Sequence, residues 1–299
     1  MRHLGYLRYF HAVSRLRSIR KAAEELHVAQ SAVSRQIKNL EDEIGAALFE
    51  RHPRGVRLTV AGAILAKYAH QTMLNLDRAR SEIDDLRSLR RGTVSICTVE
   101  AGIADILPQV IGAFRRRYPS VKISVWVRGT HGVVEALAND DADIGLAFNT
   151  PRHPEIKVVA RQEQQLNAVV APDHPVAGHR TVRMSELRDH PIALPDASFG
   201  IRQLVDEIQR SAGLSLEPAL LTDSIQALAN FAKIGAGVSF LPFFAVKGDV
   251  QARKLVAVPL ADKQARKSSA EVIIHAGRQL PITAEEFLAE LKSALSLLR

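Results

Sequence analysis

Cys97 is the only cysteine among 299 residues, and long apolar runs are missing. A lone cysteine cannot form a disulfide within the chain or build a cysteine cage around a metal. The histidines include no pair at a ligand spacing such as H-E-x-x-H, so we expect neither a metal ion nor another cofactor. Because the sequence has no stretch of about 18 apolar residues and no signal-peptide core, we expect a cytoplasmic protein without a membrane partner.

The sequence patterns of common catalytic sites are missing as well. There is no G-x-S-x-G turn for a serine nucleophile and no G-x-x-x-x-G-K loop for a nucleotide phosphate. Serine, histidine and aspartate residues are present, but a catalytic triad would arise from them only by coincidence. We therefore expect that the protein is not an enzyme.

Positive charge is concentrated in the first part of the chain. The net charge is +8, and residues 1–91 hold 17 lysine and arginine residues against 10 acidic ones, whereas the remainder holds 23 against 22. A basic segment joined to a near-neutral body favours an anionic polymer or a membrane surface as partner of the first part. A basic surface that is merely solvated explains the charge equally well, so charge alone does not decide.

Apolar spacing predicts three short helices near the N-terminus. "LGYLRYFHAVSR" has one apolar face, and Ser18 can cap a second helix, "IRKAAEELH". After the tight turn "HVAQ", a third helix has the buried stripe Val33, Ile37, Leu40 and Ile44. Its opposite face carries Ser31, Ser34, Arg35 and Lys38. Two short helices around a tight turn, the second with a polar and basic face, indicate a helix-turn-helix.

The residue types on that face suit DNA. Serine and glutamine are short enough to let a helix sit in the major groove, while arginine and lysine neutralise phosphates and contact guanine. The helix start near Gln30 and Ser31 adds N–H groups that favour a phosphate. An ordinary surface helix with a solvated face is the alternative. The next segment argues against it, because Arg51, Arg54 and Arg57 surround a Pro/Gly turn and predict a small hairpin wing.

One long helix is predicted from Thr59, as its N-cap, to about Arg90. Its apolar seam consists of Leu65, Ala69, Met73, Leu76, Ala79, Ile83 and Leu86. We interpret this helix as a linker that also pairs with a second chain. The alternative is a long helix folded back on its own domain.

A new domain begins at about residue 92, where the pattern changes to alternating strands and helices. This rhythm predicts an open, mainly parallel sheet. The expected organisation is α+β and multi-domain: a winged helix-turn-helix over 1–58, a linker and dimerisation helix over 59–91, and a two-lobed α/β domain over 92–299. Lobe I takes about 92–161 and 267–299, because the last strand and helix return to it, and lobe II takes about 162–266.

The run "AAEELHVAQSAVSRQIKNLEDEIGAALFERHPRGVRLTVAG", residues 22–62, resembles the N-terminal signature of the LysR-type transcriptional regulators. A later segment, "AKIGAGVSFLP", resembles another element of that family. The resemblance implies a winged helix-turn-helix that binds double-stranded DNA as a dimer, usually within a dimer of dimers. It also implies a periplasmic-binding-protein-like domain that senses a small-molecule effector.

The resemblance assigns DNA contacts to seven residues of this sequence. They are Gln30, Ser31, Ser34, Arg35 and Lys38 in the recognition helix, with Arg51 and Arg54 in the wing. Ser31 stands where many family members have proline, so base preference is expected to differ while the DNA-binding role stands.

The effector site is expected where parallel strands end and helices begin, because helix N-termini there offer backbone donors. Four loops meet this rule: "CTVEAG", "RGTHGV", "PDASFGIRQ" and "LTDSIQ". In the family, the corresponding loops line the cleft between the lobes. The expected effector contacts are Thr98, Glu100, Thr130, His131, Ser198, Phe199, Arg202 and Thr222.

Several of these residues have structural alternatives. Thr130 and Ser198 can simply cap their helices, and Arg202 can form a surface ion pair with Asp196 or Asp206 instead of holding a carboxylate. Glu100 would repel an anion unless it binds an ammonium group or pairs with an arginine. The effector is therefore expected to be a carboxylate, or an amphoteric or amine-bearing molecule.

The sequence thus predicts a transcriptional regulator that binds specific DNA and responds to an effector held between two lobes. The alternative is a DNA-bound architectural or constitutive regulator without a ligand. The effector, the target genes and the direction of regulation do not follow from the sequence.

Overall fold

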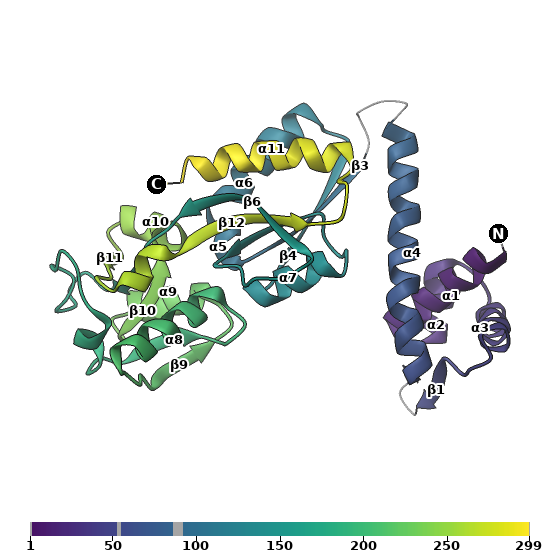
Figure 1. Cartoon of the computed structure of the whole chain (residues 1–299), viewed down its shortest axis with the longest axis horizontal. Coiled ribbons are helices and arrows are strands. Elements are labelled where there is room, and N and C mark those ends of the chain that lie inside the picture. Colours follow the sequence, from purple (N-terminus) through teal and green to yellow (C-terminus); the bar gives the residue numbers. More distant parts are fainter. Residues whose placement is uncertain (1, 53–54, 86–91, 299) are drawn as a thin grey trace. The chain divides into compact units, whose positions relative to one another are not determined.

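The structure is a computed structural model that describes residues 2–52, 55–85 and 92–298. The chain divides into two compact units, Met1–Arg80 and Ser81–Arg299 (Figure 1). Within the described ranges, every helix is too short or too polar to span a bilayer.

The first unit is a winged helix-turn-helix, as predicted. Its elements are α1 (Arg2–Leu16), α2 (Ile19–Leu26), α3 (Gln30–Ile44), the antiparallel hairpin of β1 (Phe49–His52) and β2 (Gly55–Leu58), and most of α4 (Val60–Asp85). The core is formed where the apolar faces of the helices meet, with Phe10, Val13, Ala22 and Val33 buried.

Local hydrogen bonds explain where the helices begin and end. The Ser18 hydroxyl accepts from the Lys21 amide and caps α2, as predicted from the sequence. His27 then adopts the left-handed conformation, with φ 54°, and turns the chain sharply before α3. At the far end of α3, the Glu41 carboxylate accepts from the amides of Leu48 and Phe49 and so fixes the start of the wing.

Two packing predictions for this unit need correction. Ile44 is 49% exposed, so the buried stripe of α3 stops at Leu40; Ile44 is the last residue of the helix, and Gly45 then leads the chain away. In α4, Ala69 is fully buried and Leu65 packs against the helix-turn-helix core. The first two residues of the predicted dimerisation seam therefore cover their own domain.

The apolar residues of α4 that remain uncovered lie on another face. Val60, Ile64 and Tyr68 are 82%, 60% and 61% exposed, and their spacing of four residues places them in one row. Thr59 caps the helix as predicted, since its hydroxyl accepts from the Gly62 amide at 3.0 Å. The side chains of the later seam residues, Ala79, Ile83 and Leu86, lie outside the described part.

The second unit has two lobes, each built on a five-stranded sheet. In lobe I, the strand order is β4 (Val121–Val127), β3 (Gly92–Thr98), β5 (Ile144–Phe148), β12 (Ser269–His275), β6 (Ile156–Glu163). The helices of this lobe are α5 (Glu100–Ala104), α6 (Ile106–Arg117), α7 (Thr130–Ala138) and α11 (Ile282–Ser296). Figure 1 shows α6 and α11 side by side on one face of the sheet and α7 on the other.

Lobe II has the strand order β11 (Val256–Pro259), β7 (Leu166–Val170), β10 (Val238–Pro242), β8 (Ile192–Pro195), β9 (Pro218–Thr222). Its helices are α8 (Gly200–Ala212), α9 (Ile225–Lys233), α10 (Phe243–Gln251) and the short 3-10 helices η1 (Met184–Leu187) and η2 (Lys263–Lys267).

The sheets are mixed, whereas the sequence predicted mainly parallel ones. Strands β4, β3 and β5 are parallel, but β12 runs antiparallel to both β5 and β6. The reason is that the chain crosses between the lobes twice. The first crossing leads from β6 to β7 and the second from β11 to β12, and these strands pair antiparallel to their neighbours. The two crossing segments are joined where the Gln164 amide donates to the Ser268 carbonyl at 2.8 Å.

Candidate functional sites

The polar face of α3 is exposed on the surface of its unit, where a partner molecule can reach it. Gln30, Ser31, Ser34, Arg35 and Lys38 are all exposed, while the opposite stripe is buried. The residue before the helix, Ala29, has no side-chain acceptor, so the first amides of α3 stay uncapped. Such amides can donate to a phosphate oxygen.

The two cations of this face, Arg35 and Lys38, form no ion pair within the described part of the chain. In the wing, Arg57 is exposed and Arg51 lies in β1, but the side chain of Arg51 and the whole of Arg54 fall outside the described residues. The unit therefore presents unpaired positive charge beside short polar side chains, which is the chemistry that binds nucleic acid.

Between the lobes of the second unit lies a pocket of about 600 Å³, which we call the cleft pocket. Ser198 and Phe199 line it, and its charged or titratable residues are Glu100, Arg128, His131, Glu135, Asp196 and Asp223. Four of the eight predicted effector residues thus meet there: Glu100, His131, Ser198 and Phe199. With four carboxylates around one guanidinium, the pocket favours a cation over an anion.

Glu100 in this pocket already has partners in the other lobe. Its carboxylate accepts from the amides of Ile225 and Gln226, at 2.6 and 3.1 Å, and from the Ser224 hydroxyl at 3.2 Å. These groups form the N-terminus of α9, whose dipole stabilises a negative charge. Glu100 therefore joins lobe I to lobe II, and among the described residues its partners are these groups of α9 and not the arginine that the sequence offered as one alternative.

Thr130 also joins the lobes, and it does not cap α7, which was the structural alternative to an effector contact. The N-cap of α7 is Gly129, while the buried Thr130 hydroxyl donates to the Phe148 carbonyl and accepts from the Gly200 amide at 3.1 Å. A Cβ on Gly200 would lie 1.9 Å from the Phe148 oxygen. Only glycine permits this close approach of α8 to lobe I.

The α8 start resembles the α7 start in lacking a side-chain cap. Its N-cap is Phe199, so the capping alternative for Ser198 does not hold either. Ser198 instead accepts the His131 amide on its carbonyl, at 3.1 Å, and donates its own amide to Asp196. The ring nitrogen Nε2 of His131 lies 2.7 Å from the side-chain nitrogen Nε2 of Gln203.

The remaining predicted effector residues do not line the cleft pocket. Thr98 is fully buried, and its hydroxyl donates to the Val99 carbonyl. Arg202 pairs with Asp206 at 2.8 Å and donates to the Pro195 carbonyl, which is the ion-pair alternative that the sequence left open. Thr222 accepts the Ser224 amide. Arg202 is the main reason to expect a carboxylate effector, and Asp206 already neutralises its charge.

Cys97 has the environment of a structural residue. It is fully buried at the end of β3, and burial raises the pKa of its thiol to about 11, an effect that the charge of Arg128 only partly offsets. The thiol is therefore protonated at neutral pH and a poor nucleophile. Across the ranges that the structure describes, no three acidic, histidine or cysteine side chains are grouped for a metal ion.

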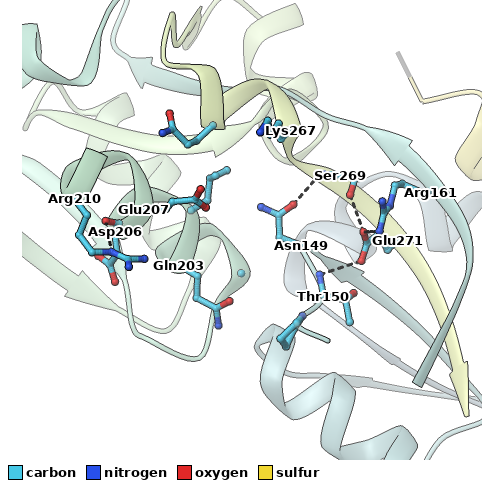
Figure 2. A pocket seen from close by; sticks show the side chains of 14 residues that line it. Asn149, Thr150, Arg161, Gln203, Asp206, Glu207, Arg210, Lys267, Ser269 and Glu271 are labelled. Carbon is cyan, nitrogen blue, oxygen red and sulfur yellow. Dashed lines mark hydrogen bonds and ion pairs between the residues drawn. The ribbon is translucent and has the colours of Figure 1, made fainter. Parts of the chain in front are cut away.

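A second pocket, of about 570 Å³, was not predicted from the sequence. It lies beside the two crossing segments, between α8 of lobe II and strands β6 and β12 of lobe I, and we call it the crossover pocket (Figure 2). The residues that line it are scattered along the sequence between Asn149 and Glu271 and belong to both lobes. None of them also lines the cleft pocket. No local motif could indicate it, because it depends on how the lobes pack.

Comparison with known proteins covers nearly the whole chain. Residues 4–63 match the family model described as bacterial regulatory helix-turn-helix protein, lysR family, and residues 87–296 match that of the LysR substrate binding domain. The chain is 29% identical to the RuBisCO operon transcriptional regulator of Allochromatium vinosum, over 85% of this chain and 84% of that protein. It is 30% identical to the transcriptional dual regulator GltC of Bacillus subtilis, over 95% of this chain and 94% of that protein.

A solved structure shares the fold. Full-length CbnR, determined in complex with its target DNA, aligns with a TM-score of 0.68 at 22% identity, covering 97% of this chain and 99% of that one. At this identity the likeness supports the architecture of both units and no finer conclusion.

Proposed function

Because the chain belongs to the LysR family of transcriptional regulators, it is a DNA-binding regulator with an effector-binding domain, and we propose which surfaces perform these two tasks. In this proposal 1–58 binds DNA, 59–91 links and dimerises, and 92–299 binds the effector. The architectural alternative is not favoured, since the second family model describes a substrate-binding domain. We assign the protein no catalytic role and place it in the compartment that holds the DNA, the cytoplasm in a bacterium.

The exposed face of α3 is the observation that carries the DNA-binding part. Ser31, Ser34, Arg35 and Lys38 project from a helix whose other side is anchored in a core, so the helix can enter a major groove without unfolding its unit. Gln30 lies at the helix start, where the uncapped amides favour a phosphate. Arg51 and Arg54 complete the proposal as backbone contacts of the wing.

We further propose that α4 carries the dimer contact, as part of a dimer or tetramer. Val60, Ile64 and Tyr68 form an exposed apolar row that the described unit leaves uncovered. A row of this kind on a helix suits pairing with a second copy. A two-fold symmetric dimer would present two recognition helices and would therefore bind an inverted repeat.

Selection of bound fragments from genomic DNA tests this part. The full chain should enrich fragments that share two inverted half-sites, separated by about one helical turn or a multiple of it. Enrichment without any shared half-site would indicate nonspecific binding of a basic protein and would contradict the proposal.

The cleft pocket is the proposed effector site, and its charge favours an effector with an amino group. Glu100 and Asp196 accept from backbone amides, while Glu135 and Asp223 are exposed at the pocket and, among described residues, have no side-chain partner. An ammonium group can pair with the latter two, and His131 and Ser198 offer further polar contacts. Since Arg202 is occupied by Asp206, a simple carboxylate is the less favoured effector.

Thermal unfolding of the full chain with putrescine, arginine, glutamate and malate tests the effector class. We expect stabilisation by amine-bearing probes, about 2.7 kcal/mol when the probe reaches 100 times its Kd. Glu135→Gln with Asp223→Asn should weaken that binding about ten-fold, because a charged hydrogen bond is worth about 1.5–3 kcal/mol. The control, Glu155→Gln with Glu217→Gln, removes two exposed acids outside the pocket and should have no effect. Absence of stabilisation by both putrescine and arginine would contradict this assignment.

A further inference from the structure

The crossover pocket is built from charged and polar side chains that face each other across the two lobes. Figure 2 shows Asn149, Thr150, Arg161, Ser269 and Glu271 on the lobe I side, opposite the α8 side chains of lobe II. At about 570 Å³, it is large enough for a small metabolite. It goes beyond the effector site proposed above, because the two pockets share no residue.

The lobe I wall is organised by a buried carboxylate. Glu271 is only 2% exposed; its Oε1 accepts from the Ser269 hydroxyl and forms an ion pair with Arg161 Nη2, both at 2.8 Å. Its Oε2 accepts from the Thr150 amide at 3.0 Å. Two hydrogen bonds and one ion pair therefore compensate the charge of Glu271, whose role is to hold the Arg161 guanidinium at the wall.

Arg161 retains donors that this pairing does not use. A guanidinium has five N–H groups, and within the described chain the ion pair with Glu271 is the one interaction of the Arg161 side chain. The side chain is 61% exposed, so the remaining N–H groups are open to a ligand. The Arg161–Glu271 pair therefore presents the fixed Arg161 guanidinium to the pocket and not the negative charge of Glu271.

Asn149 supplies a second fixed donor on the same wall. The backbone amide of Asn149 donates to the Ser269 carbonyl at 3.0 Å, and its side-chain Oδ1 accepts from the Ser269 backbone amide at 2.9 Å. Because Oδ1 must face that amide, the Nδ2 group faces the pocket, as Figure 2 shows. The residue has φ 51°, a left-handed conformation that only a few residue types adopt readily and that these two bonds maintain.

The lobe II wall adds positive charge that is not fully compensated. The Asp206 carboxylate there is paired with Arg202, and the Arg210 Nε donates only to the Asp206 carbonyl, at 3.3 Å. Lys267 at the end of η2 has no side-chain partner among the described residues, and neither has Glu207. After the paired groups are set aside, two cations and one carboxylate remain, together with the donors of the lobe I wall.

This balance defines a class of ligand. Surplus N–H donors and positive charge bind an oxyanion, and a lone carboxylate such as Glu207 accepts from a hydroxyl group. We propose that the crossover pocket binds a small hydroxylated oxyanion, either a carboxylate or a phosphate ester. Asn149 and Arg161 contact it from lobe I, and Lys267 and Arg210 contact it from lobe II. Such a ligand bridges the lobes beside their crossing segments and gives the protein a second input, of opposite charge to that of the cleft pocket.

Calorimetric titration of the full chain with citrate, glycerol 3-phosphate and inorganic phosphate tests the proposal. We expect saturable binding of citrate or glycerol 3-phosphate that weakens at least ten-fold in Asn149→Asp, which exchanges the fixed donor for a negative charge, and in Lys267→Gln. Arg266→Gln removes a neighbouring exposed charge outside the pocket and should bind as the wild type does. Tighter binding of glycerol 3-phosphate than of citrate would identify the phosphate ester as the ligand class.

Three results would overturn the proposal. One is that no probe binds at millimolar concentration, and another is that both pocket variants bind as tightly as Arg266→Gln does. The third is that inorganic phosphate binds as tightly as the two organic probes, which would indicate general anion attraction. Glu135→Gln with Asp223→Asn provides a separate control, because these cleft-pocket changes should leave anion binding intact whether or not the effector assignment holds.

Discussion

Replacing Arg35 and Lys38 together by alanine should weaken binding to the selected DNA site roughly 10- to 100-fold at fixed salt. Both side chains are exposed on α3, and within the described chain neither is neutralised by an ion pair. The double substitution removes guanine or phosphate interactions from each recognition helix of a dimer. The slope of log affinity against log salt should also become shallower, by about 0.9 for every phosphate that the protein no longer neutralises.

The matched control removes the same charge from the other unit. Arg115 and Arg116 are exposed on α6, so Arg115→Ala with Arg116→Ala lowers the net charge equally without touching α3. Fluorescence anisotropy at several salt concentrations measures both effects. If the α6 variant loses as much affinity as the α3 variant, the net charge of the protein governs DNA binding, and α3 has no special role.

Replacing Gly200 by alanine should destabilise the two-lobed unit by about 1–3 kcal/mol, the usual cost of forcing extra atoms into a packed site. The new Cβ would lie 1.9 Å from the Phe148 carbonyl oxygen, so α8 must move away from lobe I. That movement also breaks the bond from the Gly200 amide to the buried Thr130 hydroxyl. Thermal unfolding of the full chain measures the decrease in stability.

Gly178→Ala is the appropriate control for this substitution. A Cβ at Gly178 meets no atom within 4 Å, so this substitution causes no steric clash. It still changes the conformational entropy of the unfolded chain in the same way as Gly200→Ala does. A Gly200→Ala protein that unfolds at the temperature of the Gly178→Ala protein would show that the lobes do not populate this close arrangement.

The sequence predicts local features of this protein well. The buried stripe of α3, the Ser18 and Thr59 caps and the hairpin wing all depend on residues within a few positions of each other, and the structure confirms them. The exposure of Ile44 departs from the helical pattern, because the pattern does not reveal that the core ends one turn earlier. The partner of the α4 seam is also ambiguous in the sequence, since a helix covering its own domain and a helix covering a second chain have the same periodicity.

Contacts between the lobes could not be predicted in this way. From the sequence alone, Glu100 is discordant in a cleft expected to hold an anion. In the structure it accepts from backbone amides of α9, among them that of Ile225, which is 125 residues away in the sequence. Thr130 is an expected effector contact with helix capping as its alternative, but its hydroxyl bonds Gly200 in the other lobe. The crossover pocket likewise depends on Asn149 and Ser269, whose pairing follows from the second crossing of the chain.

Methylation interference on the selected DNA site tests most directly whether α3 reads the major groove. Dimethyl sulfate modifies guanine N7, which faces the major groove, and adenine N3, which faces the minor groove. We predict that methylated guanines within both half-sites block binding of the full chain, and that the variant lacking Arg35 and Lys38 loses part of this sensitivity. Interference confined to adenine N3 would refute major-groove binding by α3, because it would place the protein in the minor groove.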